Sequence, residues 1–377
     1  MISFNLRAFA TALFLGSAIA AVGSLPAAVP AEASARPAVG KLLQEAIRLA
    51  GSGNTSGAGE KVREAESVGG LTSGDQQAIE QTKSYIAAKN GSGATGSKAK
   101  FANDYNAGRY HDVVGEDADE LRKAGQYDGE SELVVAQAYY LSGQYAEAIR
   151  AAREAGGSTA QELELSAAFK SGDSATMRDV LEDLVSEGKT QYWGNLLTSA
   201  ENTKGLQDHQ TLDIYRLRFL TGSLRSPDDY MLTAELALQL GSPQEAANVM
   251  QKGIDAKTLS GDRATRLLNL AKAQAAKDSA GFGAMQKAAD AAKTGDADVK
   301  LGEEYWGFGR YSDALSTVQS GIKKGVSDKA NAQIRLGQAY LGAGQKDAAE
   351  RAFNSVTKDD GNAQVIAHLW SIYARTH

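Results

Sequence analysis

The sequence predicts an all-α protein in which helical hairpins stack into a right-handed solenoid. Two observations support this: the composition and an internal repeat. The chain has 377 residues, with 40 glycines but only 5 prolines, and much of its 42% hydrophobic content is alanine. Alanine has the highest intrinsic helix propensity, whereas the β-branched and aromatic residues that favour strands are sparse. This composition favours closely packed helices over sheets.

The internal repeat lies near the C-terminus, where two copies of one pattern are 35 residues apart. Each copy has a Leu-Gly pair, a tyrosine, a glycine, an alanine and a further apolar residue. These residues are Leu301-Gly302, Tyr305, Gly309, Ala314 and Val318 in the first copy, and Leu336-Gly337, Tyr340, Gly344, Ala349 and Phe353 in the second. A related copy lies earlier in the chain, at Val135-Ala136, Tyr139, Gly143, Tyr145, Ala148 and Ala152.

The spacing within a copy predicts a helix, a tight turn and a second helix. Leu301 and Tyr305 are four residues apart, so they share one face of a helix. Gly302 has no side chain, which allows the second helix to approach closely, and Ala314 is the small residue expected at that contact. Gly309 can adopt a left-handed backbone conformation, which lets the chain reverse after the first helix.

These residues resemble the tetratricopeptide repeat (TPR), which has a period of about 34 residues and one helix–turn–helix per unit. The resemblance implies a superhelix in which the first helix of each unit lines a concave groove. The inward positions fall two and five residues after the leucine of the Leu-Gly pair, at Gln137, Tyr140, Glu303, Trp306, Gln338 and Leu341. The resemblance implies that these residues bind a peptide or protein partner. The alternative is that they simply face solvent.

The first 33 residues predict a secretory signal. Arg7 precedes an uncharged apolar run from Ala8 to Leu25, and small residues with Ala-x-Ala spacing follow. Cleavage fits after either Ala33 or Ala35. A permanent membrane anchor is the alternative, but the run is only weakly hydrophobic. We expect an exported protein without a stable membrane anchor after cleavage, in the periplasm rather than the extracellular medium.

The remaining chain divides into three predicted parts. Residues 34–88 form an N-terminal helical segment, in which Ala46, Leu49, Gly53, Ala58, Val62 and Ala65 suggest a degenerate repeat. Residues 89–98 are rich in Gly and Ser and predict a linker or long loop. Residues 99–377 form the TPR-like solenoid. The whole chain is expected to hold roughly eight to ten helix pairs, with weaker repeat copies at 164–184 and 234–250.

One segment of the solenoid is more apolar than its neighbours. In the stretch LDIYRLRFL, Leu212, Tyr215 and Phe219 share one helical face, whereas Ile214, Leu217 and Leu220 lie on another. A helix that is apolar on more than one side is buried between neighbours. We therefore expect this to be the most thoroughly packed helix in the middle of the array.

Charge and residue types exclude several functional classes. The formal net charge of −6 argues against nucleic-acid binding. The absence of cysteine excludes disulfides, thiolate zinc sites and cysteine nucleophiles. None of the four histidines forms an HExxH motif. His209, near Asp208 and Asp213, could bind a metal in principle, but a polar cluster at a helix start is favoured.

Two sequence motifs of cofactor binding and catalysis are excluded. Gly91-x-Gly93-x-x-Gly96 matches a dinucleotide-binding pattern, but that motif needs a preceding strand, and the residues before it predict a helix. There is no GxSxG motif. We expect no catalytic residue, cofactor or metal, and predict a non-catalytic periplasmic scaffold or adaptor. The alternatives are a cell-envelope hydrolase that grips a polymer with its superhelix, and a small-ligand carrier.

Overall fold

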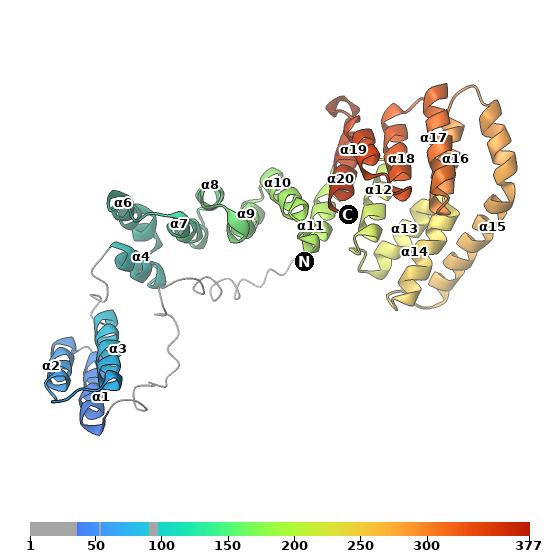
Figure 1. Ribbon diagram of the computed structural model, residues 1–377. Helices are drawn as coiled ribbons and strands as arrows, with labels where there is room; N and C mark the ends of the chain where they lie inside the picture. The colour runs from blue at the N-terminus through green and yellow to red at the C-terminus, as the bar shows by residue number, and fades with distance from the viewer. Residues whose placement is uncertain (1–35, 53, 90–96) are drawn as a thin grey trace. The chain divides into compact units, whose positions relative to one another are not determined.

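A computed structural model describes residues 36–52, 54–89 and 97–377 of the chain. In these ranges all regular secondary structure is helical, which confirms the predicted all-α class (Figure 1). The predicted signal (1–33) and the GxGxxG motif (91–96) lie outside the described residues. The segment that precedes the motif is helical, as expected. Among the described helices, none combines the length and apolarity needed to cross a bilayer.

The chain forms two compact units. The first ends at Ala167 and the second begins at Ala168, so the boundary falls within helix α9. This boundary was not among the predicted ones. The helices of the first unit are α1 (Pro37–Gly51), α2 (Thr55–Glu66), α3 (Ser73–Lys89), α4 (Ser97–Asn106), α5 (Tyr110–Asp112), the π-helical η2 (Val113–Asp117), α6 (Ala118–Lys123), α7 (Gly129–Leu141), α8 (Tyr145–Ala155) and the start of α9 (Gly157–Ser171).

The N-terminal segment is a three-helix arrangement of α1, α2 and α3. Its core contains the small residues predicted at the helix contact, because Ala46, Ala58 and Ala65 are fully buried. Asp75 near the start of α3 is also buried, and its carboxylate accepts hydrogen bonds from the backbone and side chain of Arg36 at 2.8 and 2.7 Å. Helix α3 extends through Lys89 and α4 begins at Ser97, so both ends of the predicted linker are helical, and residues 90–96 lie outside the described residues.

The second unit contains the remaining helices, and its longest helix, α15, lies at its outer edge in Figure 1. The elements are α10 (Ser174–Ser186), the 3-10 turn η3 (Thr190–Tyr192), α11 (Trp193–Glu201), α12 (Asp208–Leu220), α13 (Pro227–Gln239), α14 (Pro243–Asp255), α15 (Asp262–Ala291), α16 (Asp296–Gly307), α17 (Tyr311–Lys324), α18 (Lys329–Gly342), α19 (Lys346–Asn354), the 3-10 turn η4 (Lys358–Asp360) and α20 (Asn362–Thr376).

The C-terminal repeats form hairpins at the predicted positions. A Cβ atom on Gly302 in α16 would lie only 2.4 Å from Cγ2 of Val318 in α17, and one on Gly337 would lie 2.3 Å from Phe353. The glycines therefore allow close helix contact, as their spacing predicts. Gly309 has a φ of +72°, in the left-handed region that favours glycine, and it separates α16 from α17. The hairpin prediction is confirmed.

Helices of the second unit close into a ring. Along the ring, α12 packs on α13, α13 on α14, α14 on α16, α16 on α18 and α18 on α20. Helix α20 then returns to pack against α12, and also against α10. An open solenoid brings only neighbouring repeats together, so the return of α20 to α12 is a closure that the repeat pattern does not specify, within the predicted helical-hairpin architecture. We refer to α12, α13, α14, α16, α18 and α20 as the ring.

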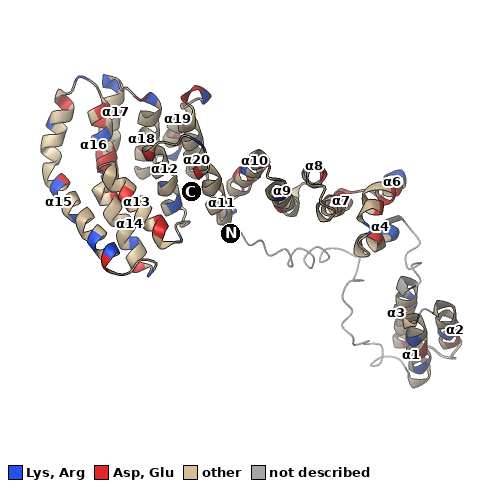
Figure 2. Cartoon of the chain, turned by 180° about the vertical axis from the view of Figure 1, so that it is seen from behind, with Lys and Arg blue, Asp and Glu red and all other residues tan. Residues whose placement is uncertain are grey.

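Helix α12 is buried on several sides, as the LDIYRLRFL pattern predicts, except at its last residue. Leu220, which the pattern placed on an apolar face, is 39% exposed where the helix ends. Leu212, Ile214 and Leu217 have no exposed surface. The charged residues Asp213 and Arg216 of the same helix are also buried. Elsewhere in the chain acidic and basic residues are interleaved along the helices, and many form short-range surface pairs (Figure 2).

Candidate functional site

In the first unit, two of the predicted groove residues contact other parts of the repeat. Gln137 is half-buried, and its Oε1 accepts a hydrogen bond from the Tyr105 hydroxyl at 2.9 Å, which connects α7 to α4. Tyr140 is 8% exposed and packs edge-on against Tyr145 of α8, with ring centroids 5.6 Å apart. Gln137 therefore bridges two helices, and Tyr140 lies inside the α7–α8 hairpin. Partner binding by either residue stays a prediction.

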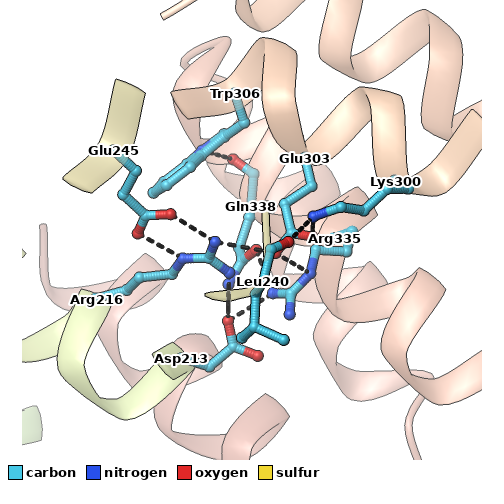
Figure 3. A network of polar contacts seen from close by, with 9 residues as sticks. All are labelled: Asp213, Arg216, Leu240, Glu245, Lys300, Glu303, Trp306, Arg335 and Gln338. Atoms are coloured by element: carbon cyan, nitrogen blue, oxygen red, sulfur yellow. Dashed lines mark hydrogen bonds and ion pairs between the residues drawn. The ribbon is translucent and has the colours of Figure 1, made fainter. Parts of the chain in front are cut away.

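In the second unit, three of the four predicted residues come together inside the ring (Figure 3). The indole N–H of Trp306 in α16 donates a hydrogen bond to the backbone carbonyl of Gln338 in α18, at 3.1 Å. Glu303 lies one turn before Trp306 and joins the same cluster of polar contacts. Leu341 is partly buried near the end of α18 and is not part of this cluster.

Arg216 of α12 forms the densest part of the cluster. Its Nε and Nη2 donate to the two carboxylate oxygens of Glu245 in α14, at 2.7 and 2.6 Å. Its Nη2 also lies 2.9 Å from Oε1 of Glu303. The guanidinium carbon is 5.3 Å from the centroid of the Trp306 ring, which is a cation–π distance. Two-point contact between Arg and a carboxylate is among the strongest pairings that side chains form.

Asp213, one turn before Arg216, connects α12 to α18. Its Oδ1 accepts hydrogen bonds from Nη1 of Arg216 at 2.9 Å, Nη1 of Arg335 at 2.5 Å and Nε2 of Gln338 at 2.9 Å. Nε of Arg335 also lies 3.1 Å from Oε1 of Glu303. Asp213 and Arg335 are 122 residues apart in sequence. The contacts of Asp213 with Arg335 and Gln338 join α12 to α18, which are not neighbours in the ring, so the cluster crosses its interior.

Formal charges balance within this cluster, which we call the cross-ring network. Its charged members are three acids and three bases: Asp213, Glu245, Glu303, Arg216, Lys300 and Arg335. Lys300 is the most exposed of the cations, and its Nζ lies 3.3 Å from Oε2 of Glu303. The same ammonium donates to the backbone carbonyl of Leu240, which follows α13. Because the buried members alone have one excess negative charge, Lys300 completes the balance.

The charges of the network are mutually stabilised. Burial alone would raise the pKa of Asp213, but Arg335 and Arg216 outweigh it and hold the pKa below its usual range. The same balance, with Lys300 added, keeps the pKa of Glu303 well below its usual range. Burial alone would lower the pKa of Arg216, but Glu245 and Glu303 raise it well above its usual value. All these groups are therefore charged at neutral pH.

This arrangement is suited to holding helices together. Its oxygens and N–H groups are largely engaged with one another; Oδ2 of Asp213 is a buried atom without a hydrogen-bond partner in the described part of the chain. Glu303 and Gln338 bind side chains of their own chain instead of lining an open groove. Partner binding by these two residues stays a prediction, and it would require the ring to open. Within residues 36–52, 54–89 and 97–377, no group of three or more His, Asp or Glu is placed to hold a metal.

Sequence reasoning did not identify five charged members of the network: Asp213, Arg216, Glu245, Lys300 and Arg335. A signal was present in LDIYRLRFL, where Asp213 and Arg216 interrupt a helix that is apolar on several sides. A charge on such a helix needs a buried partner, because an isolated buried charge is very unfavourable. The partners themselves lie on distant helices and have no pattern that marks them.

The polar residues at the start of α12 have a local role. Asp208 and His209 lie in its first turn, where Gln207 and Gln210 form a reciprocal capping box. This confirms the favoured interpretation of Asp208 and His209 as a helix-start cluster. Asp213 does not belong to that cluster, because its carboxylate takes part in the cross-ring network.

No protein-family model matches the chain, and no curated protein matches it. Among solved structures, the pentatricopeptide repeat protein PPR10 from maize is similar with 12% identity and a TM-score of 0.27, over 89% of this chain and 62% of PPR10. This chain thus spans less than two thirds of PPR10. The P58(IPK) TPR domain has 12% identity and a TM-score of 0.19, over 88% of this chain and 77% of that domain. The APC/C hetero-tetramer Cut9–Hcn1 has 10% identity and a TM-score of 0.21, over 89% and 72%.

These likenesses are too distant to indicate a function. The architecture follows instead from the hairpins of the chain itself. Glycines with positive φ separate their helices at Gly143, Gly241, Gly309 and Gly344, and fully buried alanines lie in their second helices at Ala148, Ala246, Ala314 and Ala349. The chain is an all-α, TPR-like helical repeat protein.

Proposed function

We propose that this protein is an exported, non-catalytic scaffold that holds a protein or peptide partner on the hairpins of residues 97–167. The observation that supports this location is the difference between the two units. In the second unit, the predicted groove residues Glu303 and Gln338 are engaged in the cross-ring network. In the first unit, α7 carries Gln137 and, one turn later, Leu141, whose side chain is 48% exposed. This side chain offers apolar area that a bound partner can bury.

The charge of this segment indicates the chemistry of the partner. Residues 97–167 contain thirteen acidic and seven basic residues, so their formal charge of −6 equals that of the whole chain. Five of the basic residues already pair with carboxylates in the segment: Lys98, Lys100, Arg109, Arg122 and Arg153. The excess negative charge favours a partner that presents lysine and arginine residues, because complementary charge speeds and orients association.

Crosslinking and affinity capture with the mature protein test the docking site. We expect Leu141→Ala to weaken capture of the partner about tenfold, because the truncation removes apolar area that the partner would bury. Leu270→Ala in α15 is a matched control, because Leu270 is 49% exposed and belongs to the second unit. Equal capture by Leu141→Ala and the unchanged protein, or a loss confined to Leu270→Ala, would contradict the proposed site.

Export is tested separately by the N-terminus of the mature protein. If residues 1–33 act as a cleavable signal, intact mass of the periplasmic protein should correspond to a chain that starts at Ser34 or Arg36. A full-length chain that stays in the membrane fraction would show that this segment is an anchor instead.

A further inference from the structure

The ring is closed by α20, which packs on α12 and, beside it, on α10 and α11. We call the contacts of α20 with these three helices the seam. Across this seam, Nε2 of His368 in α20 lies 2.8 Å from Oε2 of Glu182 in α10, although the residues are 186 positions apart. Near the start of α20, the side-chain amide of Asn362 donates to the backbone carbonyl of Lys204 at 3.0 Å. The seam therefore depends on a few polar contacts in addition to its apolar packing.

The other end of the seam is aromatic. Trp193 of α11 is buried, and its ring packs edge-on against Tyr373 of α20 with centroids 6.1 Å apart. The imidazole of His377 stacks on Tyr373 at 4.4 Å and lies 6.1 Å from Trp193. Two of the four histidines of the chain, His368 and His377, are thus in the contacts that close the ring.

The two histidines respond to pH in opposite ways. The hydrogen bond to Glu182 raises the pKa of His368 above its ordinary value, against the effects of burial and of Arg375. Burial lowers the pKa of His377, and the ammonium of Lys346 in α19 acts in the same direction, against the backbone carbonyl of Tyr373. Closure therefore favours the charged form of His368 and the neutral form of His377.

Several other charged residues of the helices that pack on α20 have partners of their own. On α19, Glu350 lies 3.9 Å from Arg375 of α20. On α12, Arg218 pairs with Glu201 at 2.5 Å, and Asp213 and Arg216 belong to the cross-ring network. On α18, Arg335 belongs to the same network. The ionisable groups that act on the two seam histidines are thus Glu182, Arg375 and Lys346.

We propose that the seam between α20 and the α10–α11 region is a pH-sensitive latch, in which the His368–Glu182 pair and the stacked His377 close the ring most firmly near neutral pH. The sign of each contribution follows from linkage. The contribution of His368 is fully present below the pKa of an ordinary histidine, and it is lost as pH rises through the elevated pKa of the folded protein. The contribution of His377 is present above the ordinary pKa and is lost as pH falls through its lowered one. The latch consequently loosens both in alkali and in acid.

Amide hydrogen exchange of α20 in the intact protein tests this latch. At each pH, the exchange rate of a variant is divided by that of the unchanged protein, which cancels the intrinsic pH dependence of exchange. At about pH 6, we expect α20 to exchange roughly two- to fivefold faster in His368→Gln, the range for a partly exposed ion pair. At pH 8.5 this ratio should approach one. Glu182→Gln should behave in the same way, and the double variant should show no further increase.

His377→Phe tests the acid side, because phenylalanine keeps the aromatic stack and cannot be protonated. Below about pH 5.5, α20 should exchange more slowly in this variant than in the unchanged protein, and the difference should disappear above pH 7. His111→Gln, an exposed histidine of the first unit, is the control and should change nothing. The proposal is overturned if the ratios do not depend on pH, or if α13 and α14 lose protection as much as α20, since the pair would then stabilise the whole unit and not a local latch.

Discussion

The α7–α8 hairpin of the first unit and the α16–α17 hairpin of the second carry the same repeat pattern in different surroundings. In α7, the predicted inward residue Gln137 makes a hydrogen bond to a tyrosine of α4. In α16, the equivalent residue Glu303 contacts two arginines from α12 and α18. The repeat pattern thus specifies the hairpin, whereas a few charged residues on distant helices determine whether the inner side of the array is filled.

The strongest test of this difference removes one arginine from each unit. Arg216→Ala would leave Asp213, Glu245 and Glu303 with fewer partners in a buried setting, so we expect a loss of about 3–5 kcal/mol in the unfolding free energy of the second unit. Arg153→Ala in the first unit removes an arginine that is 52% exposed and pairs with Glu164. Its expected effect is below about 1 kcal/mol.

Urea denaturation, monitored in each unit by amide hydrogen exchange, measures the loss of unfolding free energy for both variants. Losses of similar size would mean that the cross-ring network stabilises the protein no more than a surface pair does. A larger loss for Arg153→Ala would reverse the comparison between the two units.

A second test concerns the helix contact within the α16–α17 hairpin. Gly302→Ala places a methyl group 2.4 Å from Cγ2 of Val318 and 3.1 Å from the backbone oxygen of Ala314, so the helices must separate slightly. We expect a loss of about 1–3 kcal/mol in the unfolding free energy, as for other overpacked contacts. The matched control is Gly281→Ala in α15, where a Cβ atom would meet no atom within 4 Å. That change should stabilise the protein by up to about 1 kcal/mol, since alanine is the better helix former.

Thermal and urea denaturation of the two glycine variants measure this contrast. If both Gly302→Ala and Gly281→Ala increase the unfolding free energy, α17 moves away from α16 without strain. A destabilising Gly281→Ala would show that this position of α15 needs the freedom of glycine.

The hairpins could be predicted from sequence because the pattern that specifies each one is local. The residues Leu301, Gly302, Gly309 and Ala314 lie within a single helix–turn–helix, and each has a direct physical role there. The cross-ring network could not be predicted in the same way. It depends on Asp213 and Arg335, which are 122 residues apart and have no periodicity in common. The buried charges on α12 could have signalled that partners exist, but not where they lie.

The candidate site was predicted only in part, for a related reason. Counting positions from the Leu-Gly pair placed Glu303, Trp306 and Gln338 at the inner side of their hairpins, and the structure brings these three together. The same rule took Tyr140 for a groove residue, although its ring packs between helices of one hairpin. Position in a repeat therefore indicates to which side of the hairpin a side chain points, but its burial depends on the neighbouring side chains.

The prediction with the smallest expected effect compares two adjacent residues of α16, Glu303 in the cross-ring network and Glu304 outside it. The pKa of Glu303 is held low by Arg335, Arg216 and Lys300 against its burial. Burial raises the pKa of its neighbour Glu304 to about 7, with Asp278 and Glu303 adding to the effect and Lys300 opposing it. Oε2 of Glu304 is buried and has no hydrogen-bond partner among the described residues. Burial thus acts on Glu304 with less compensation from cations.

This difference predicts how stability depends on pH. Because the folded pKa of Glu304 exceeds the ordinary value, the folded state binds this proton more tightly, and the resulting stability is present at pH 4.5 and is lost as pH rises through about 7. Glu304→Gln mimics the protonated side chain, so its unfolding free energy should match that of the unchanged protein near pH 4.5 and exceed it by roughly 1–2 kcal/mol at pH 8. Urea denaturation of both proteins from pH 4.5 to 8 measures the difference. A difference that stays constant over this range would mean that Glu304 is solvated as well as an ordinary surface carboxylate, and that burial in α16 affects charge only inside the ring.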